Sequence, residues 1–200
     1  MAQTREPAAP EAQAILDFWF LPEDDPRHGT TRNEWFRKNP AFDALIRERF
    51  GAFVEQALAG AFPSWDEDGR GAVARILLLD QFPRNLFRKQ PEAFAGDGLA
   101  LAAAEALLAR QADQALPPIM RVFAYLPFEH AESPAAQERS VACFEALAAR
   151  WPEAAGYLDY ARRHRAVIAR FGRFPHRNEI LGRASTPEER VFLREQGSRF

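Results

Sequence analysis

The strongest constraint on the fold is the spacing of apolar residues, which recurs every three to four positions along much of the chain. Residues 41–58 show it best, and the apolar side chains that share one face there are Phe42, Leu45, Ile46, Phe50, Phe53, Val54 and Leu58. Such spacing predicts an amphipathic α-helix. Asn39 and Pro40 supply an N-cap and a first helical residue, and Gly60 follows the expected end.

Composition and terminal signals extend the helical prediction to most of the chain. Val, Ile and Thr together account for only 16 residues, whereas Ala, Leu, Glu and Arg dominate, which favours helices over strands. Capping-box spacing occurs at Ser64 with Glu67 and at Thr186 with Glu189. Further helices are expected at residues 10–20, 64–81, 98–110, 118–126, 134–150, 152–171 and 187–196. We therefore predict an all-α fold of antiparallel helical hairpins.

Length and composition favour one domain that covers residues 1–200, with its core between about residues 12 and 193. A chain of 200 residues buries a sizeable core, and 47% hydrophobic and 12% aromatic residues are too many for a disordered chain. The linking stretches are short and polar, as loops within a domain are. No clean repeat of about 34 residues with tetratricopeptide spacing is present, although paired helices can stack in that manner.

Charge, hydropathy and cysteine content limit the possible partners of the protein and its cellular compartment. A net charge of -2 and a pI near 6.1 lack the basic field that nucleic-acid binding uses. Charges interrupt every apolar stretch before about 18 residues, the length of a membrane span, and the first ten residues contain no signal-peptide run. The single Cys143 has apolar neighbours and cannot form an internal disulfide. We expect a cytoplasmic protein without nucleic-acid or membrane partners.

Three short elements share one design and concentrate the polar side chains of interest. Residues 79–85, 125–132 and 170–178 each place an aromatic residue or Leu at the end of an apolar helix, then Pro, then polar groups. Proline is expected to stop each helix, so that the following side chains project from a defined position. This design suits a binding site.

The residue types in these elements are suited to holding an anion. Arg provides a planar fork of donors, Asn both donates and accepts, and His exchanges protons near neutral pH. The candidate ligand-binding residues are Asp80, Arg84, Asn85, Glu129, Arg173, Arg177 and Asn178. For acid–base catalysis the candidates are His130 backed by Glu132, and His176 beside Arg177.

Simpler interpretations apply to the same residues. The carboxylates of Asp80, Glu129 and Glu132 can pair with the arginines and only pin the helix ends together. A metal site is disfavoured, because the order of Glu129, His130 and Glu132 matches no common ligand motif. His164 is expected to be a histidine of a helix surface or of the core. No GxSxG sequence or glycine-rich phosphate loop occurs, and no motif assigns a cofactor.

Four motifs read in order resemble a known family. Residues 18–20, 78–85, 125–130 and 170–178 are similar to the bacterial family called domain of unknown function nine hundred and twenty-four, over about residues 12–193. The resemblance implies an all-helical, tetratricopeptide-like superhelical fold and no agreed substrate, cofactor or catalytic residue. Ala131 stands where the resemblance leads us to expect Ser, so no role can be given to a hydroxyl there.

Three functional hypotheses follow from these observations. The first is binding of a small anionic or polar metabolite in a pocket lined by Arg, His and Asn. The second is an enzyme in which a histidine moves a proton and arginines stabilise an anion. The third is a scaffold for protein partners, with a groove lined by aromatic residues such as Trp35, Trp65 and Phe87.

Overall fold

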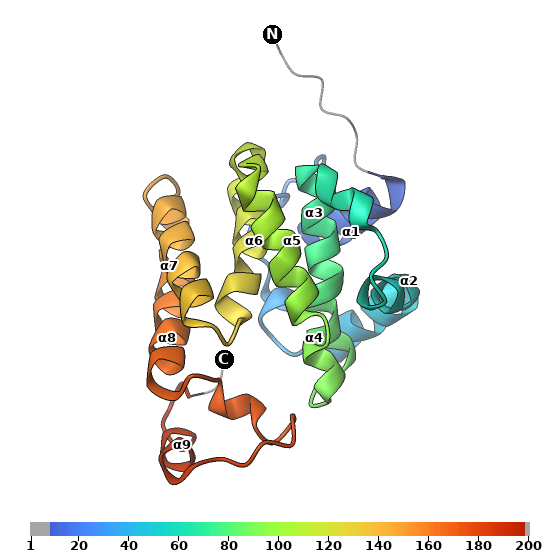
Figure 1. Cartoon of the computed structure of the whole chain (residues 1–200). Coiled ribbons are helices and arrows are strands. Elements are labelled where there is room, and N and C mark those ends of the chain that lie inside the picture. Colours follow the sequence, from blue (N-terminus) through green and yellow to red (C-terminus); the bar gives the residue numbers. More distant parts are fainter. Residues whose placement is uncertain (1–8, 199–200) are drawn as a thin grey trace.

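The computed structural model describes residues 9–198, and this part of the chain contains helices and turns but no β-strand (Figure 1). The α-helices are α1 (Pro10–Phe20), α2 (Pro40–Leu58), α3 (Gly69–Ile76), α4 (Phe82–Leu86), α5 (Asp97–Ala109), α6 (Pro118–His130), α7 (Pro134–Ala148), α8 (Ala155–Phe171) and α9 (Pro187–Phe192). Short helical turns lie at Asn33–Trp35, Pro63–Glu67, Leu77–Gln81, Pro91–Phe94, Ala112–Ala115, Pro152–Ala154 and Pro175–Arg177. The predicted all-α fold is confirmed.

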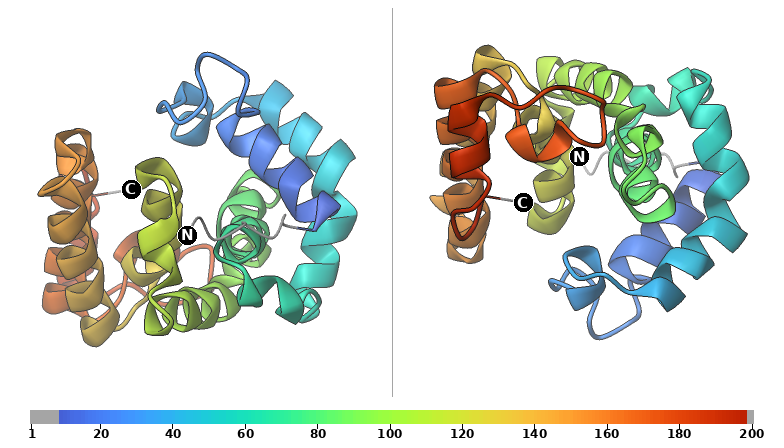
Figure 2. Two further views of the ribbon diagram at one scale, coloured as in Figure 1. Left: turned by 90° about the horizontal axis from the view of Figure 1, so that it is seen from above. Right: turned by 90° about the horizontal axis from the view of Figure 1, so that it is seen from below.

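The central helices α3, α5 and α6 pack against one another and carry the other helices on two sides (Figures 1 and 2). On one side α1 packs against α3, and α2 packs against α4. On the other side α7 lies between α6 and α8. The expected limits of the domain and its tetratricopeptide-like superhelical packing stay predictions. No helix within residues 9–198 is both long enough and apolar enough to cross a membrane.

An aromatic cluster around Trp19 joins the first helices to the centre. The Trp19 side chain has no exposed surface, and its ring lies 5.9 Å from Trp35, 5.4 Å from Phe82 and 5.6 Å from Phe123. Aromatic pairs at such distances add to the stabilisation from burial alone. Trp35 and Trp65 are both buried, so they do not line the exposed groove that the scaffold hypothesis required.

Capping side chains mark the starts of α2, α3, α7 and α9. The Asn39 side chain accepts hydrogen bonds from the backbone N–H groups of Ala41 and Phe42, and Thr186 and Glu189 form a complete capping box. The capping box expected at Ser64 is wrong. Residues 63–67 form a 3-10 turn instead, and Asp68 caps α3 by accepting from the N–H of Gly71.

Proline does not stop two of the three helices that it was expected to stop. Pro127 lies inside α6, which continues to His130. Pro83 follows a π-helical turn, η3 (Leu77–Gln81), in which the N–H of Phe82 reaches back five residues to the carbonyl of Leu77. A π-turn widens the helix, which makes room for the proline ring. The polar residues of the first two elements therefore lie on or beside helices rather than in loops.

The backbone of the π-turn also lies close to the start of α5. Pro83 has no N–H to donate to the carbonyl of Leu79, and this carbonyl faces Gly96, where an added Cβ would lie only 2.2 Å from its oxygen. Gly96 has φ -90° and ψ -5°, which any residue can adopt. The need for glycine at this position is therefore steric. The close approach places Asp97 beside the residues of the π-turn.

The segment after α8 folds back under the ends of the central helices (Figure 1). Gly172 ends α8 with φ +69°, a conformation that glycine adopts without strain. Phe174 of this segment forms a small apolar cluster with Val167 and Ile168 of α8. It then crosses toward α5 and carries Arg177 to Asp97, whose sequence position is 80 residues away.

We expect Gly96→Ala to destabilise the fold and Gly98→Ala to leave it intact. A Cβ at Gly96 collides with the Leu79 carbonyl, and overpacking of this kind costs about 1–3 kcal/mol. At Gly98 no atom lies within 4 Å of the added Cβ, and the change is neutral or stabilising by less than about 1 kcal/mol. Urea denaturation of both variants measures the difference. Equal stability of the two variants would contradict the steric argument.

Candidate functional site

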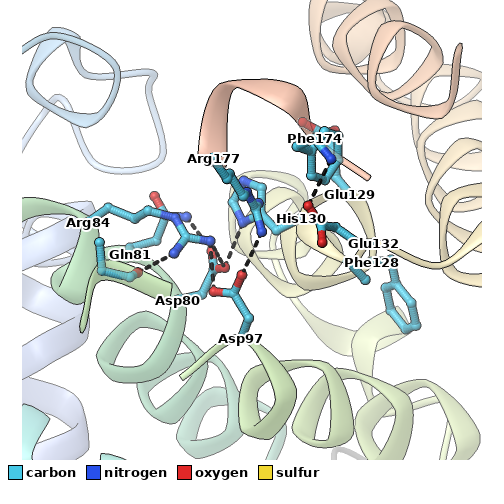
Figure 3. Close-up of polar contacts among 12 residues, drawn as sticks. Asp80, Gln81, Arg84, Asp97, Phe128, Glu129, His130, Glu132, Phe174 and Arg177 are labelled. Atoms are coloured by element: carbon cyan, nitrogen blue, oxygen red, sulfur yellow. Dashed lines mark hydrogen bonds and ion pairs between the residues drawn. The ribbon is translucent and has the colours of Figure 1, made fainter. Parts of the chain in front are cut away.

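Side chains from five elements of the fold meet in one place (Figure 3). Asp80 comes from the π-turn, Arg84 from α4 and Asp97 from the first turn of α5. His130 comes from the last turn of α6, and Arg177 comes from the segment after α8. The three polar elements of the sequence therefore converge, and we call these five residues the central cluster.

Asp80 and His130 form the closest pair of the central cluster. Asp80 Oδ1 lies 2.6 Å from His130 Nδ1, and Gln81 Nε2 donates to Oδ2 of the same carboxylate. Burial by itself would raise the pKa of Asp80, but the charge and hydrogen bond of His130 and the charge of Arg84 outweigh it and lower the pKa to about 2. The Asp80 side chain is 1% exposed and that of His130 is 18% exposed, so the imidazole is the accessible partner.

Arg84 and Arg177 share one carboxylate. Arg84 Nη2 lies 2.8 Å from Asp97 Oδ1, and Arg177 Nη1 lies 3.0 Å from Asp97 Oδ2. Both guanidinium groups also lie 4.7 Å from the centre of the Phe94 ring, and Arg177 lies 4.6 Å from the ring of Phe174. Arg84 also lies 3.6 Å from the ionised carboxylate of Asp80, so the two guanidinium groups face two carboxylates.

The guanidinium of Arg177 is incompletely paired. Its side chain is 7% exposed, and its Nε atom is buried without a hydrogen-bond partner among the described residues. Burial, and secondly the charge of Arg84, lower the pKa of Arg177 to about 10 against the opposing effect of Asp97. A buried donor without an acceptor is costly, which marks this edge of Arg177 as a place for an acceptor.

A second carboxyl–imidazole pair lies next to the central cluster. Glu129 Oε1 is 3.2 Å from His164 Nδ1, which also lies 2.9 Å from the carbonyl of Tyr160. Burial, and secondly the charge of Asp80, raise the pKa of Glu129 to about 8. Burial lowers the pKa of His164 to about 3. At neutral pH the contact therefore joins two neutral groups and is not an ion pair.

Glu132 does not support His130, contrary to the expectation. Its two oxygens accept from Arg183 at 2.6 and 2.9 Å and from the backbone N–H of Phe174 at 2.8 Å. Arg183 also donates to the Phe174 carbonyl. The role of Glu132 is to hold the segment after α8 against the end of α6, while Asp80 takes its place beside His130.

Several other candidate residues belong to neighbouring networks. Arg173 pairs with Glu189 at 2.7 Å, and Asn178 donates to Glu189 and to Ser185. These contacts fasten α9 to the segment that precedes it. Asn85 donates to Asp43 on α2, at the far side of α4. None of these three candidate residues is hydrogen-bonded to the central cluster.

His176 is adjacent to the central cluster. Its ring lies 5.6 Å from the ring of Phe174, and the side chain is largely buried. Burial, followed by the charge of Arg177, lowers the pKa of His176 to about 4. The imidazole is therefore neutral at neutral pH. Cys143 is a free thiol whose pKa burial raises to about 11, in keeping with the expected inert cysteine.

Two residues of the site were missed in the sequence. Asp97 stands outside the three polar elements, and its only sequence signal is an acidic residue in the first turn of a helix. His164 was expected to be a histidine of a helix surface or of the core and was not assigned to the site; it is 5% exposed and contacts Glu129. A histidine on the buried face of α8 is the signal that could have identified it.

Two surface cavities are lined by residues outside the central cluster. One of about 480 Å³ is lined by residues of α1, α2 and the loop between them, including Phe18, Phe42 and Leu45. Another of about 320 Å³ lies between α5 and α7 and includes Leu108 and Phe128. Among residues 9–198 no three His, Cys, Asp or Glu side chains are placed to share a metal ion.

We expect Glu129→Gln to change how stability depends on pH. The pKa of Glu129 is raised from 4.5 to about 8 on folding, so its contribution is fully present below pH 4.5 and is lost as pH rises toward 8. Relative to the variant, the wild type should lose about 1.4 kcal/mol per pH unit in this window. Urea denaturation at several pH values checks this, and parallel pH profiles would show that Glu129 ionises normally.

Comparison with known proteins places the chain in a family. The family model described as a bacterial protein of unknown function, DUF924, matches residues 15–197. A solved structure of a protein of unknown function from Agrobacterium tumefaciens is 42% identical, with a TM-score of 0.80, and the match covers 92% of this chain and 96% of that one. No curated protein matches the chain. The chain therefore belongs to the bacterial DUF924 family.

Proposed function

We propose that the chain binds a small molecule bearing a carboxylate, phosphate or similar oxyanion, and that Arg177 is the main anchor. The observation that carries this proposal is the buried Nε of Arg177, which has no hydrogen-bond partner among the described residues. The Nε and Nη2 atoms form one edge of a guanidinium, and this edge matches the two oxygens of a carboxylate or phosphate.

The surroundings of Arg177 favour an anion. Its Nη1 is already held by Asp97, and its plane lies against the rings of Phe94 and Phe174, so the guanidinium is fixed before a ligand arrives. Arg84 supplies a second cation that shares the same Asp97. A fixed fork of donors binds an oxyanion at a small cost in side-chain entropy.

We expect Arg177→Lys to abolish anion binding and to leave the protein folded. Lysine keeps the positive charge but loses the two-donor edge. Sulfate, phosphate and acetate should raise the melting temperature of the wild type, because each binds only the folded state, and the variant should show no such rise. Arg162→Lys is the matched control, since Arg162 is 53% exposed and pairs with Glu145 on the surface.

The outcomes of this thermal-shift experiment are distinct. An equal rise in both variants would assign the effect to general ionic strength and remove Arg177 from binding. A variant that unfolds at room temperature, with Arg177→Gln behaving alike, would show that Arg177 only pins the segment after α8 to α5. A rise confined to the wild type and the Arg162 variant supports the proposed site.

A second candidate function is acid–base catalysis on the bound anion. The observation that favours it is the pair of Asp80 and His130, in which an ionised buried carboxylate accepts from Nδ1 of a partly exposed imidazole. This contact fixes the tautomer, so the other ring nitrogen, Nε2, is the atom that accepts a proton from a substrate. The carboxylate stabilises the imidazolium that forms.

Under this second function, His130→Ala should abolish turnover while anion binding at Arg177 persists. Asp80→Asn should lower turnover by at least about tenfold, because the imidazole loses its orientation. An NMR survey of metabolites with carboxylate or phosphate groups, repeated on both variants, measures these effects. Turnover that survives unchanged in His130→Ala would exclude His130 from the chemistry.

A further inference from the structure

The end of α6 carries two carboxyl–imidazole pairs side by side. Asp80 with His130 forms one pair, and Glu129 with His164 forms the other. The two imidazole rings lie 6.3 Å apart. The pairs differ in access, because the His130 side chain is 18% exposed whereas those of Glu129 and His164 are 5% and 6% exposed. We call Glu129 and His164 the inner pair. The acid–base chemistry proposed for His130 gives this pair no role.

Glu129 is surrounded by groups that do not stabilise a negative charge. The neutral imidazole of His164, on α8, faces the Glu129 carboxyl group. The negative charge of Asp80, on the π-turn, acts on the same group. From α7 the side chain of Gln137 donates to the backbone carbonyl of Glu129, not to its carboxyl group. The second carboxyl oxygen, Oε2, is buried without a hydrogen-bond partner. These surroundings therefore favour the protonated, neutral form of the Glu129 carboxyl group.

The inner pair is connected to the anion site through Phe174. The Phe174 ring lies 5.4 Å from the ring of His164 and 4.6 Å from the guanidinium of Arg177. The charge of Arg177 also acts on His164, where it opposes protonation. Glu129 and Arg177 thus contact opposite sides of the buried pair formed by His164 and Phe174, in a region where charges are weakly screened.

Building on the oxyanion site at Arg177, we propose that Glu129 is the proton-exchanging group that controls this site. The anion binds while Glu129 carries its proton, and loss of that proton to a base in solvent releases the anion. Only the O–H bond of the Glu129 carboxyl group breaks, and no other bond changes. The ionised carboxylate adds a buried negative charge next to Asp80 and repels the ligand.

The direction of the pH effect follows from the buried position of Glu129. Its pKa of about 8 means that the carboxyl group is mostly neutral at pH 7 and mostly ionised at pH 9. His164 and His176, with pKa values of about 3 and 4, stay neutral over this interval, and Arg177, with a pKa of about 10, keeps its charge until higher pH. Glu129 is therefore a group next to the central cluster whose ionisation falls in this interval.

The test is the pH dependence of sulfate binding, followed by calorimetry between about pH 6.5 and about pH 9. Sulfate keeps its two charges throughout this interval, so its own titration does not interfere. The wild type should lose affinity by up to about tenfold per pH unit above the pKa of Glu129, as the linkage of one proton requires. Glu129→Gln should bind sulfate as the wild type does at low pH and keep that affinity at pH 9.

A surface variant and a ligand-free measurement complete the design. Glu138→Gln is the matched control, because Glu138 is 67% exposed and pairs with Arg165 on the surface, and it should follow the wild type. A carbon NMR titration of the Glu129 carboxyl group in the ligand-free protein should show ionisation near pH 8. Ionisation well below pH 7 overturns the proposal.

The remaining outcomes separate this proposal from the proposed function. Sulfate that binds wild type and Glu129→Gln with the same pH dependence overturns the role of Glu129 and leaves the Arg177 site standing. Sulfate that binds the wild type at no pH overturns the Arg177 site and the proton linkage with it, whatever the NMR titration shows. Affinity that falls in the wild type and stays constant in Glu129→Gln supports both.

Discussion

The carboxylate of Asp80 sets the arrangement of the site, because an ionised group with no exposed surface must find its partners inside the protein. Burial of a single charge costs several kcal/mol unless cations and donors surround it. His130 and Gln81 supply those contacts, and Arg84 lies 3.6 Å away. The end of α6 and the π-turn must therefore stay in register, and the steric fit of Gly96 against the Leu79 carbonyl fixes α5 to the same turn.

The segment after α8 completes the cluster and also leaves it unsatisfied. Glu132 clamps this segment through Arg183 and the backbone of Phe174, which brings Arg177 to Asp97. The clamp positions Arg177 without providing an acceptor for its Nε. A purely structural ion-pair network would be expected to satisfy its most buried cation. The unpaired Nε of Arg177 is the observation that favours a ligand site over a network that only pins helices.

Two neighbouring carboxyl groups differ in their ionisation because their environments differ. Asp80 is charged at neutral pH because His130 and Arg84 compensate for its burial, whereas Glu129 stays neutral because its partner is an uncharged imidazole and Asp80 lies close by. Such divergence of two acids within one site is a recurring sign of acid–base function. In this chain it arises from helix packing, since the two residues lie on different helical segments and meet only where α6 passes the π-turn.

The sequence by itself determined the helices, and only the tertiary structure decided the pairings. Helix N-caps such as Asn39 and the capping box of Thr186 are readable because their hydrogen bonds span at most four residues. The helix end expected at Pro83 was wrong, because a π-turn has no clear local signal in the sequence. The three polar elements were identified, yet Glu132 was matched to His130, and Asp97 and His164 were missed. Contacts such as Arg177 with Asp97 join residues 80 positions apart, and helix packing alone selects them.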